Sequence, residues 1–459
     1  MDDTRTATLS LHQSARGPAL GLEVVWHPDP AFVGGQRSVS AGERLVLGRN
    51  SPELGGALQE PRISRRHSEL GRLGSALSIR DLDSHNGTWV NGEQVASAAL
   101  NPGDVLGVGQ VLLLVRELPI NPAPLAWGPL VGRSPELHAA LEAVDRVAGL
   151  DMPVLIQGES GTGKELVAQE LHARSGREGP FVAVNCAGVA DSLLQSELFG
   201  HVRGAYSGAE KARRGLVDQA RGGTLLLDEI GDASPALQAA LLRLLQEREL
   251  RPVGSDTAQI VDVRFVAATN RDLVREVRQG SFREDLYARL SRQVVFLPPL
   301  RARRADILVL VHSLLDGVRL SHGLAQTLLL HDWPGNVRAV QAVVEQLLLR
   351  GEGPVLEQPD WLADVLARQA RAGDALAQVA SSSVVSSAAE AGVEAPEPKR
   401  ALSAMSHAEL REILITHLGN LAAAAKALGV GRNTLYRHLQ RAGVDLEALR
   451  EELGDGRGR

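Results

Sequence analysis

Residues 158–164 read Gly-Glu-Ser-Gly-Thr-Gly-Lys, and this stretch constrains the fold more than any other part of the chain. An apolar run, residues 153–157, precedes it, and a helical pattern, residues 165–173, follows it. A glycine-rich turn between a strand and a helix lets backbone N–H groups face an anion, while a lysine neutralises phosphate charge. We therefore predict a nucleotide site. A plain flexible turn is the weaker alternative, because the whole G-x-x-x-x-G-K spacing is present.

The predicted nucleotide is ATP, and its binding residues are expected to be Gly158, Glu159, Ser160, Gly161, Thr162, Gly163, Lys164 and Glu165. Many phosphate-binding loops have Ser or Thr at the position of Glu165, where the hydroxyl binds magnesium. The metal must therefore depend on another carboxylate and on water.

Residues 222–232 supply such carboxylates. Their apolar run ends in Asp228-Glu229, and α/β sheets bind ligands at the carboxyl ends of their strands. We expect Asp228 to hold Mg²⁺ and Glu229 to polarise the attacking water, since phosphoryl transfer depends on positioning and charge neutralisation. The alternative is that Asp228 and Glu229 are a pair of surface acids in a turn with no role in catalysis.

Length and composition limit the number of domains and the class of protein. A chain of 459 residues should hold about three domains, because one core rarely exceeds ~250 residues. A net charge of -6 gives no global attraction to nucleic acid, and a single cysteine, Cys186, excludes an internal disulfide and fits a reducing compartment. No stretch of ~18 uncharged apolar residues appears, so we expect a cytoplasmic protein with no membrane contact.

Residues 20–118 contain short alternating runs separated by turn residues, namely 43–49, 76–82, 88–92 and 104–117, which predict a β-sandwich. The motifs Gly48-Arg49, Ser64 to His67 and Asn86 to Gly92 resemble those of forkhead-associated (FHA) domains. The resemblance implies phosphothreonine binding by Arg49, Ser64, Arg65 and Asn86, and loop-borne Arg, hydroxyl and amide groups suit a phosphate. Each residue taken singly also has a structural reading, and His67 is expected to be structural.

Residues 119–128 are proline-rich and predict a semi-rigid linker. After it, apolar strands alternate with helical stretches, at residues 154–156, 181–186, 224–227, 264–268 and 294–297. This alternation indicates a mostly parallel sheet with helices on both faces, in a domain that we place at residues 129–365.

Five further motifs extend this picture: Val184 to Cys186, Glu197 to His201, Ala268 to Asn270, Phe282 to Arg289 and Trp333 to Arg338. With the phosphate-binding loop, they make residues 129–350 resemble the AAA+ domain of sigma-54-dependent enhancer-binding proteins. The segment from Arg304 to Trp333 is shorter than the usual lid of that family.

The resemblance implies roles for six residues. Asn185 corresponds to a switch that restrains Glu229, and Thr269 and Asn270 to the first sensor. Arg338 corresponds to the second sensor, in a helical lid. Arg283 and Arg289 correspond to arginines that reach the nucleotide of a neighbouring subunit, which implies a homo-oligomeric, hexameric ring. Taken alone, Arg283 and Arg289 also fit a solvated helix face.

The surface loop that contacts the sigma factor in that family corresponds to Gly204, Ala205, Tyr206, Ser207, Gly208 and Ala209. Here Tyr206 and Ser207 replace the usual Phe and Thr. The ring and the hydroxyl are kept, and the methyl group is lost. An aromatic tip is a plausible contact anchor, and an ordinary glycine-rich loop is the alternative.

Residues 366–400 are rich in Ala, Ser, Glu and Pro and predict a flexible linker. Residues 401–459 read as helices around a Gly429-Val-Gly431 turn, and they resemble a Fis-type helix-turn-helix. The candidate DNA-binding residues are Arg432, Asn433, Thr434, Arg437 and Arg441, of which the first three lie where a recognition helix meets bases. A three-helix capping bundle is the alternative.

We therefore expect a multidomain chain with an N-terminal β-sandwich, a central α/β ATPase with a lid, and an all-α helix-turn-helix. The expected function is DNA-bound, ATP-driven remodelling of RNA polymerase holoenzyme containing sigma-54, under phosphothreonine control. The alternative is a phosphopeptide-gated DNA-binding ATPase that acts as a repressor or scaffold. The Tyr206-Ser207 loop discriminates between the two.

Overall fold

A computed structural model describes residues 19–74, 76–118, 127–188, 191–205, 211–315, 317–351 and 353–372. These residues belong to one compact unit, Met1–Ala375, and a second unit spans Leu376–Arg459. The predicted helix-turn-helix and most of the predicted second linker lie outside the described residues.

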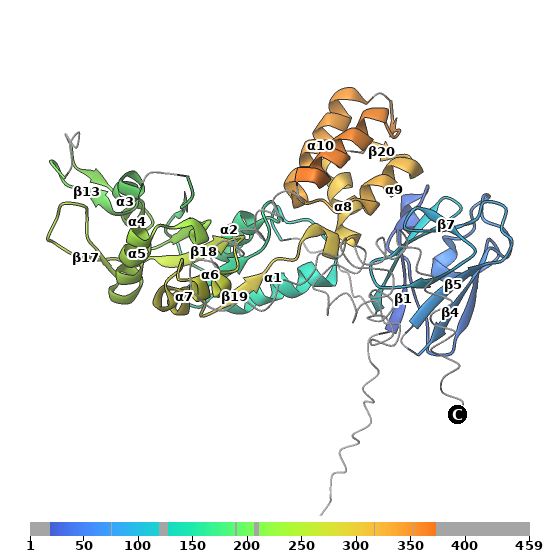
Figure 1. Cartoon of the computed structure of the whole chain (residues 1–459), viewed down its shortest axis with the longest axis horizontal. Helices are drawn as coiled ribbons and strands as arrows, with labels where there is room; N and C mark the ends of the chain where they lie inside the picture. Colours follow the sequence, from blue (N-terminus) through green and yellow to red (C-terminus); the bar gives the residue numbers. More distant parts are fainter. Residues whose placement is uncertain are drawn as a thin grey trace, which may run out of the picture. The chain divides into compact units, whose positions relative to one another are not determined.

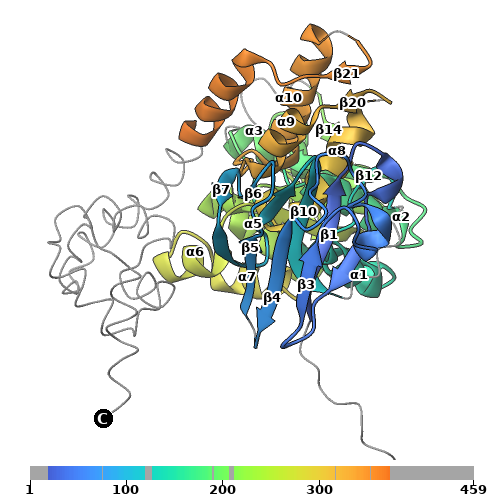
Figure 2. The same cartoon turned by 90° about the vertical axis from the view of Figure 1, so that its right-hand side faces the viewer.

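The predicted β-sandwich is confirmed and consists of two antiparallel sheets. The larger sheet has the strand order β2-β1-β10-β9-β6-β7, and the smaller has the order β3-β4-β5-β8. Its strands are β1 (Ala19–Trp26), β2 (Gln36–Ser38), β3 (Arg44–Leu47), β4 (Ser68–Leu73), β5 (Ala76–Asp81), β6 (Thr88–Val90), β7 (Glu93–Val95), β8 (Ser97–Leu100), β9 (Val105–Val108) and β10 (Val111–Leu118). Figure 2, in which the sandwich faces the viewer, shows these strands with roughly aligned axes.

One expected strand of the sandwich is in fact a hairpin. The run 104–117 forms β9 and β10, joined at Gly109 and Gln110. Gly109 has a φ of 58°, a left-handed conformation that glycine adopts without strain and that tight hairpin turns require. The run is mostly apolar on both sides of this turn, which is why the sequence did not separate the two strands.

The predicted parallel sheet is also confirmed, with the order β12-β15-β18-β11-β19. Its strands are β11 (Val154–Gln157), β12 (Phe181–Asn185), β15 (Thr224–Asp228), β18 (Arg264–Thr269) and β19 (Val294–Phe296). Its helices are α1 (Pro135–Ala148), α2 (Lys164–Ala173), α3 (Asp191–Phe199), α4 (Leu216–Gln219), α5 (Pro235–Glu247), α6 (Leu273–Gln279) and α7 (Glu284–Leu290). Two short hairpins pair β13 (Gly200–His201) with β14 (Arg213–Arg214) and β16 (Glu249–Leu250) with β17 (Gln259–Ile260).

Successive residues of the central strands point into two different cores. In β15, Leu225 and Leu227 join the core that α3 and α5 cover, whereas Leu226 joins the core under α1 and α2. A strand buried on both faces reads as a continuous apolar run, because neither set of alternating side chains meets water. The near-continuous apolar sequence is therefore explained by helices on both faces (Figure 1).

A helical lid follows the sheet. It contains α8 (Ala305–Leu314), α9 (His322–Leu330) and α10 (Asn336–Arg350), with a short parallel pair, β20 (Arg319–Leu320) and β21 (Val355–Leu356). Two helices, α8 and α9, lie in the Arg304–Trp333 segment that we expected to be short, and α10 follows it. The helices lie together in Figure 1.

Two predicted linkers differ from expectation at their ends. Residues 360–372 are helical, and Leu362 and Leu366, one turn apart, are buried in the lid core, so this part of the predicted 366–400 linker is ordered structure. At the other linker, Trp127 is 6% exposed, and the guanidinium of Arg174 lies 3.6 Å from its ring centre. In the described part of the chain, no helix combines the length and apolarity that a membrane crossing requires.

Candidate functional site

The glycine-rich loop lies between β11 and α2, as predicted. Gly161 and Gly163 have φ values of 76° and 102°, where glycine is favoured. A Cβ atom on Gly161 would lie 2.3 Å from the backbone oxygen of Gly335, so the loop also needs glycine to approach the lid. The Nζ of Lys164 donates to the backbone oxygens of Gly158 and Glu159, at 3.1 and 3.3 Å.

The acids at the end of β15 lie beside this loop. The Nζ of Lys164 is 3.7 Å from Oε1 of Glu229, and the backbone N–H of Asn270 donates to Oε2 of Glu229 at 3.2 Å. Glu229 has a φ of 49°, an uncommon conformation for a residue with a side chain, and its own N–H donates to Asp228 at 3.0 Å. The carboxylate that we expected to act on water is therefore held by the cation that we expected to bind phosphate.

A cavity of about 280 Å³ lies at this position, between the parallel sheet and the lid. It is lined by Ser160, Gly161, Gly163, Lys164, Glu165, Leu166, Asp228, Glu229, Val337, Arg338 and Gln341. Nη1 of Arg338 lies 3.4 Å from Oγ of Ser160, and the N–H of Val337 donates to Gly161 at 2.9 Å. The structure thus brings the expected loop, acids and second-sensor arginine around one cavity.

Asn336 is a residue of this site that the sequence analysis missed. It is fully buried, with a φ of 52°, and its Oδ1 accepts from the N–H of Leu300 at 2.7 Å. Its Nδ2 donates to Glu159 at 3.2 Å and to the backbone of Ser160 at 3.0 Å. Asn336 therefore joins the lid to the phosphate-binding loop. The Trp333–Arg338 motif was the available signal, but we gave a role only to its last residue.

Two arginines also hold the loop from outside the cavity. Arg301 makes two hydrogen bonds to the Glu159 carboxylate, at 2.5 and 2.7 Å, and these bonds, more than any other cause, hold the pKa of Glu159 below its usual value. Nη2 of Arg303, which is 3% exposed, donates to the backbone of Thr162 at 3.2 Å. The spacing of residues gave no signal for either contact.

The contacts of Asn185, the expected switch, and of Thr269, in the expected first sensor, are to backbone N–H groups. Oδ1 of Asn185 accepts from the N–H of Ala187 at 2.7 Å, whereas the contacts of Glu229 described above are to Lys164 and Asn270. Thr269 is buried, and its hydroxyl accepts from the N–H of Arg271 at 3.0 Å. The expected restraint of Glu229 by Asn185 is thus not among the contacts of this structure.

The two arginines expected to act in trans do not line the nucleotide cavity of their own chain. Arg283 pairs with Asp285 at 2.8 Å on the surface. Arg289 is exposed and borders a different cavity, with Asp151 and Arg264 among its neighbours. Neither side chain is thus among the residues that line the cavity at this chain's own phosphate-binding loop.

One cysteine lies near the acids without taking part in the site. Cys186 is 4% exposed, and burial, with the nearby charges of Asp228 and Asp232, raises its pKa to about 12. An apolar, protonated thiol is the structural role that we expected.

The candidate phosphopeptide residues come together on two loops of the sandwich. Oγ of Ser64 accepts from the N–H of His85 at 3.1 Å, and Nδ2 of Asn86 donates to the backbone of Arg62 at 2.6 Å. The N–H of Arg49 donates to the backbone of Ser64 at 3.0 Å, and the side chains of Arg49 and Arg65 are exposed.

His67 has a structural position, as expected. It is fully buried, its Nδ1 accepts from the N–H of Ser64 at 3.2 Å, and its Nε2 contacts the backbone oxygen of Gly87 at 3.0 Å. His67 therefore fixes the loop that carries Ser64 against the loop that carries Asn86.

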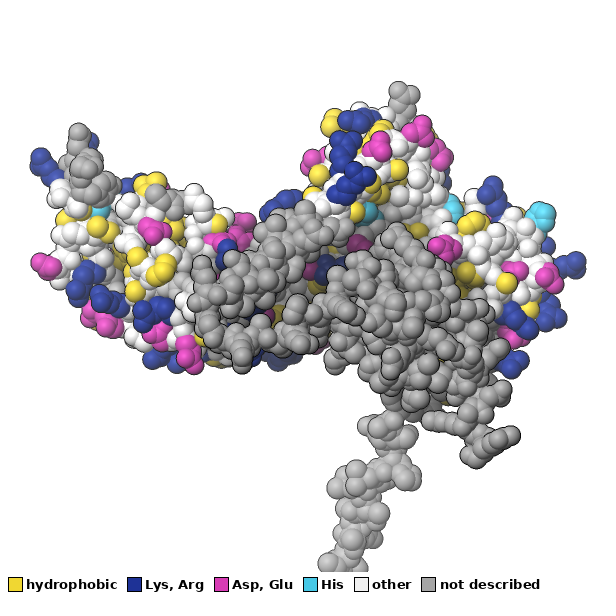
Figure 3. All heavy atoms as spheres, in the orientation of Figure 1, with side chains coloured by type: hydrophobic (Ala, Val, Ile, Leu, Met, Phe, Trp, Pro, Cys, Tyr) yellow, Lys and Arg dark blue, Asp and Glu magenta, His cyan; other side chains and the backbone are white. Residues whose placement is uncertain are grey.

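Other candidate residues are described only in part. Of the sigma-contact loop, Gly204 and Ala205 are described, and Gly204 has a φ of 83°. Tyr206 to Ala209 and all five candidate DNA-binding residues lie outside the described residues. On the face shown in Figure 3, the described Lys and Arg side chains are interspersed with Asp and Glu.

The donor set fits a magnesium–nucleotide complex. Mg²⁺ takes one or two carboxylates together with phosphate oxygens and water, and Asp228 lines the cavity next to Lys164. The described residues contain no cluster of three or more His, Cys, Asp or Glu that could hold a metal ion by itself.

Comparisons with known proteins divide the chain into four matches. Residues 45–109 match the FHA domain, 130–295 the sigma-54 interaction domain, 301–378 the AAA+ ATPase lid domain, and 402–441 the Fis family of bacterial regulatory proteins.

Two curated relatives are similar over much of the chain. The regulatory protein AtoC of Escherichia coli is 38% identical over 329 residues, which cover 70% of this chain and 68% of AtoC. The transcriptional regulatory protein ZraR of Klebsiella oxytoca is 50% identical over 248 residues, which cover 51% of this chain and 56% of ZraR. The chain thus spans just over half the length of ZraR. A crystal structure of NtrX from Brucella abortus in complex with ATP is 31% identical, with 69% of this chain and 70% of that chain covered and a TM-score of 0.47.

Proposed function

The chain belongs to the family of sigma-54-dependent transcriptional regulators, and from this premise we propose that it couples ATP hydrolysis to the remodelling of a sigma-54 RNA polymerase. The observation that carries the proposal is the single cavity shared by Lys164, Asp228, Glu229 and Arg338. Glycine-loop amides, a lysine, two acids and a lid arginine are the groups that phosphoryl transfer from ATP to water requires.

In this proposal ATP binds with its phosphates on the Gly158–Glu165 loop and against Lys164. Asp228 holds Mg²⁺, which supplies charge neutralisation on the phosphate oxygens when it is bound. Glu229 orients and polarises the attacking water, and Arg338 senses the γ-phosphate from the lid. Thr269 and Asn270 lie beside Glu229 and report the same phosphate, because the N–H of Asn270 donates to the Glu229 carboxylate.

Lys164 and Glu229 contact each other, and phosphate competes with the Glu229 carboxylate for the Lys164 ammonium group. Phosphate binding therefore frees Glu229 for the water. This contact restrains the acid before nucleotide binds. The role of Asn185 as the switch that restrains Glu229 stays a prediction.

Arg283 and Arg289 complete the site of a neighbouring subunit, so that turnover requires a homo-oligomer, as a hexameric ring. Their exposure, away from the cavity of their own chain, supports this role. An arginine supplied in trans stabilises transition-state charge and makes hydrolysis depend on assembly.

The N-terminal sandwich receives the regulatory signal, and the C-terminal segment selects the DNA site. Arg49, Ser64, Arg65 and Asn86 bind a phosphothreonine-containing protein, which the exposed arginines and the two adjoining loops favour. Residues 401–459 bind enhancer-like DNA through Arg432, Asn433, Thr434, Arg437 and Arg441, a role supported by the match to the Fis family. A protein that acts on DNA-bound RNA polymerase works in the bacterial cytoplasm.

Transcription from a sigma-54 promoter with purified protein, polymerase holoenzyme and ATP tests the proposal. We expect promoter opening by the wild type and by Ser207→Thr, and we expect Tyr206→Ala to hydrolyse ATP without opening the promoter. Removal of residues 401–459 should abolish site-specific footprinting and leave ATP hydrolysis intact.

The same assay addresses the alternative function. If the wild type hydrolyses ATP and binds DNA but neither opens the promoter nor traps sigma-54 with a transition-state nucleotide analogue, the repressor or scaffold function replaces the activator. Trapping by Ser207→Thr alone would attribute the loss to the altered loop.

A further inference from the structure

Strand β10 of the sandwich is buried on both of its faces. Val111, Leu113 and Val115 belong to the core of the sandwich, whereas Leu112 and Leu114 belong to the core of the lid. Side chains alternate between the two faces of a strand, so the larger sheet offers one apolar face to each core. The apolar sequence of β10 therefore encodes a contact between the sandwich and the ATPase, in addition to the sandwich itself.

Strand β1 reaches the same contact through a bulge. The register of β1 against β10 shifts between Val24 and Trp26, where two consecutive residues face one partner position. Val24 remains in the sandwich core, and Val25 and Trp26 join the lid core. The ring of Trp26, which is 7% exposed, lies edge-on to His322, with 5.3 Å between the ring centres.

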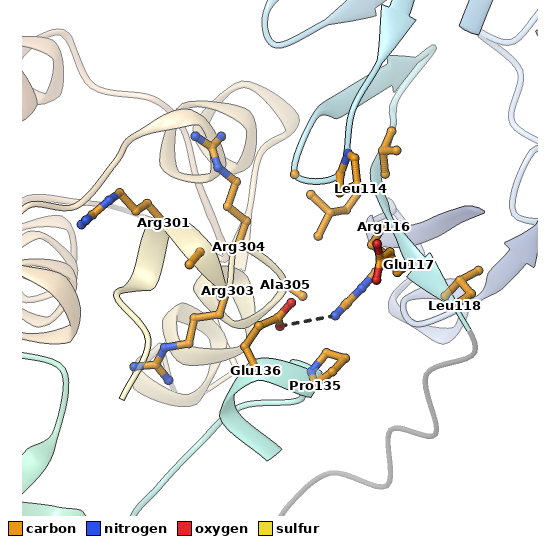
Figure 4. Close-up of a pocket in the computed structure, with 14 residues that line it drawn as sticks. Leu114, Arg116, Glu117, Leu118, Pro135, Glu136, Arg301, Arg303, Arg304 and Ala305 are labelled. Atoms are coloured by element: carbon orange, nitrogen blue, oxygen red, sulfur yellow. Dashed lines mark ion pairs between the residues drawn. The ribbon is translucent and has the colours of Figure 1, made fainter. Parts of the chain in front are cut away.

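A buried carboxylate ties the sandwich to the α/β domain as well. Glu23 of β1 is fully buried and pairs with Arg116 of β10 and, at 3.1 Å, with Arg133, just before α1. Arg116 also lies 3.8 Å from Glu136 of α1, and Figure 4 shows this pair bridging the two domains. A buried charge is destabilising when one partner is removed, so these pairs favour the docked arrangement.

The docked sandwich also borders the segment that supports the phosphate-binding loop. A cavity of about 470 Å³ has β10 on one side and residues 301–305 on the other (Figure 4). Arg301 and Arg303, which contact Glu159 and Thr162, are among its lining residues. The sandwich thus contacts both halves of the ATPase between which the nucleotide cavity lies.

The phosphopeptide loop leads to the same contact in two steps. Asn86 donates to the backbone of Arg62, as described above, and a Cβ atom on Gly109, in the turn between β9 and β10, would lie 3.3 Å from the backbone of Arg62. The N–H of Gln110, in the same turn, donates to Oε2 of Glu60 at 3.3 Å, and β10 then carries Leu112 and Leu114 into the lid core. On the next sandwich turn, a Cβ atom on Gly92 would lie 3.0 Å from Leu330, at the end of α9.

We propose that the docked sandwich braces the lid against the α/β domain, and that phosphopeptide binding loosens this brace and speeds nucleotide exchange. The inference rests on the proposed phosphopeptide and ATP binding. A peptide that engages Asn86 competes with its bond to Arg62, and so disturbs the loop that packs against the turn between β9 and β10. Because the nucleotide cavity is lined by Lys164 of the α/β domain and by Arg338 of the lid, a lid that is free to move opens that cavity.

The test measures the dissociation rate of a fluorescent ADP analogue from the full chain by stopped flow. The probe is the phosphothreonine peptide that the full chain retains most strongly from a degenerate library, with its unphosphorylated form as control. We expect the phosphorylated peptide to raise the rate by about 5-fold or more, within the usual range of coupling between sites. His322→Ala should raise the rate without peptide and reduce the response to peptide.

His312→Ala is the matched control, because His312 is an exposed histidine of the same lid that bonds only its own helix, at Leu308. It should behave as the wild type does. Hydrogen exchange of the wild-type chain gives a second measurement that needs no variant. Phosphopeptide should increase exchange in α9, and leave exchange in α5, which lies far from the contact in sequence and packs in another core, unchanged.

The outcomes separate this inference from the proposed function. If both ligands bind and the dissociation rate and α9 exchange stay the same, the brace is wrong and the proposed function stands. A slower dissociation with peptide also overturns the brace. If the chain does not distinguish the phosphorylated from the unphosphorylated peptide, the proposed input fails and the brace fails with it.

Discussion

The ammonium group of Lys164 lies 3.7 Å from the carboxylate of Glu229, with side-chain exposures of only 6% and 18%. This pair joins the group proposed to bind phosphate to the group proposed to act on water. Charged groups with little access to water interact strongly, so each needs a partner when nucleotide is absent. In the function proposed above, the γ-phosphate replaces Glu229 at Lys164 and frees the acid for the attacking water.

Removal of either member of this pair should give a different defect. Lys164→Ala should weaken ATP binding by at least ~10-fold through loss of a charge-assisted contact. Glu229→Gln should bind ATP as well as the wild type or more tightly, because Lys164 is released, and should slow turnover by roughly 10²- to 10⁴-fold. Fluorescence titration with an ATP analogue and phosphate release measure the two effects. Glu247→Gln, on the exposed side of α5, is the control, and weaker ATP binding by Glu229→Gln would contradict the competition.

Asn336 should control both lid stability and nucleotide affinity. Asn336→Ala removes the bonds to Leu300, Glu159 and Ser160 and leaves buried partners unsatisfied, so we expect a loss of about 1–3 kcal/mol in the free energy of unfolding. Asn336→Gly accepts the positive φ more easily but lacks the side chain, and should be less destabilised while losing the same nucleotide affinity. Denaturant titration and nucleotide binding separate the two effects.

Gln346→Ala, on the same helix, is the control. Unchanged affinity in Asn336→Gly would show that the loop does not need this contact.

Shared catalytic sites should make two inactive variants active together. Arg289→Ala lacks the arginine proposed to act in trans, and Glu229→Gln lacks the acid that acts in its own site. In a mixed oligomer, an Arg289→Ala subunit with an intact Glu229 can face a neighbour with an intact Arg289, so phosphate release should recover in part. Arg278→Ala, an exposed arginine of α6, should be active by itself. Full turnover by dilute monomer would rule out the shared site.

Arg49 should carry much of the discrimination between phosphorylated and unphosphorylated peptide. Arg49→Ala should lose ~1.5 to 3 kcal/mol of phosphopeptide binding, the range for hydrogen bonds to charged groups, with no change in binding of the unphosphorylated form. Arg44→Ala is a close control, because this arginine lies on the same domain with a side chain that is 78% exposed. Calorimetry with both peptides provides the measurement. An equal loss in the two variants would mean that net charge, and not the Arg49 position, attracts the peptide.

Cys186 should react slowly with a disulfide reagent in the folded protein. With a pKa raised to about 12, its thiolate fraction at pH 8 is only ~10⁻⁴, and the sulfur is buried. The reaction of the native chain with a disulfide reagent at pH 8 should be slow, and unfolding in guanidinium should expose a thiol with an ordinary pKa. The reaction should accelerate as pH rises towards 12, because the reactive form is the thiolate. A rapid native reaction at pH 8 would place Cys186 in an open environment.

The local parts of the site followed from the sequence alone. A phosphate-binding loop is made of consecutive residues. The strand that ends in Asp228-Glu229 runs parallel to the strand before the loop, with β18 between them, so its acids reach the same edge of the sheet. The alternation of apolar residues predicted the sandwich, and the continuous apolar runs predicted a parallel sheet with two covered faces. The hairpin turn at Gly109, the helix over residues 360–372 and the burial of Trp127 were not predicted, because the local pattern fits more than one structure at each position.

The tertiary structure decided which distant residues support the loop and which face of the sandwich is covered. Asn336 lies 177 residues from Glu159, and Arg301 lies 142 residues from it, so neither spacing carries information about the contact. In the sequence, the second apolar face of β10 shows only as more apolar residues than one face of a sandwich strand needs. The sequence does not show that the lid covers this face. The identity of a side chain determines which groups it can bond to and whether it can be buried. Its partner depends on how the fold brings distant segments together. The sequence therefore predicted the kinds of residues at the candidate site, but not the docking of the sandwich against the lid.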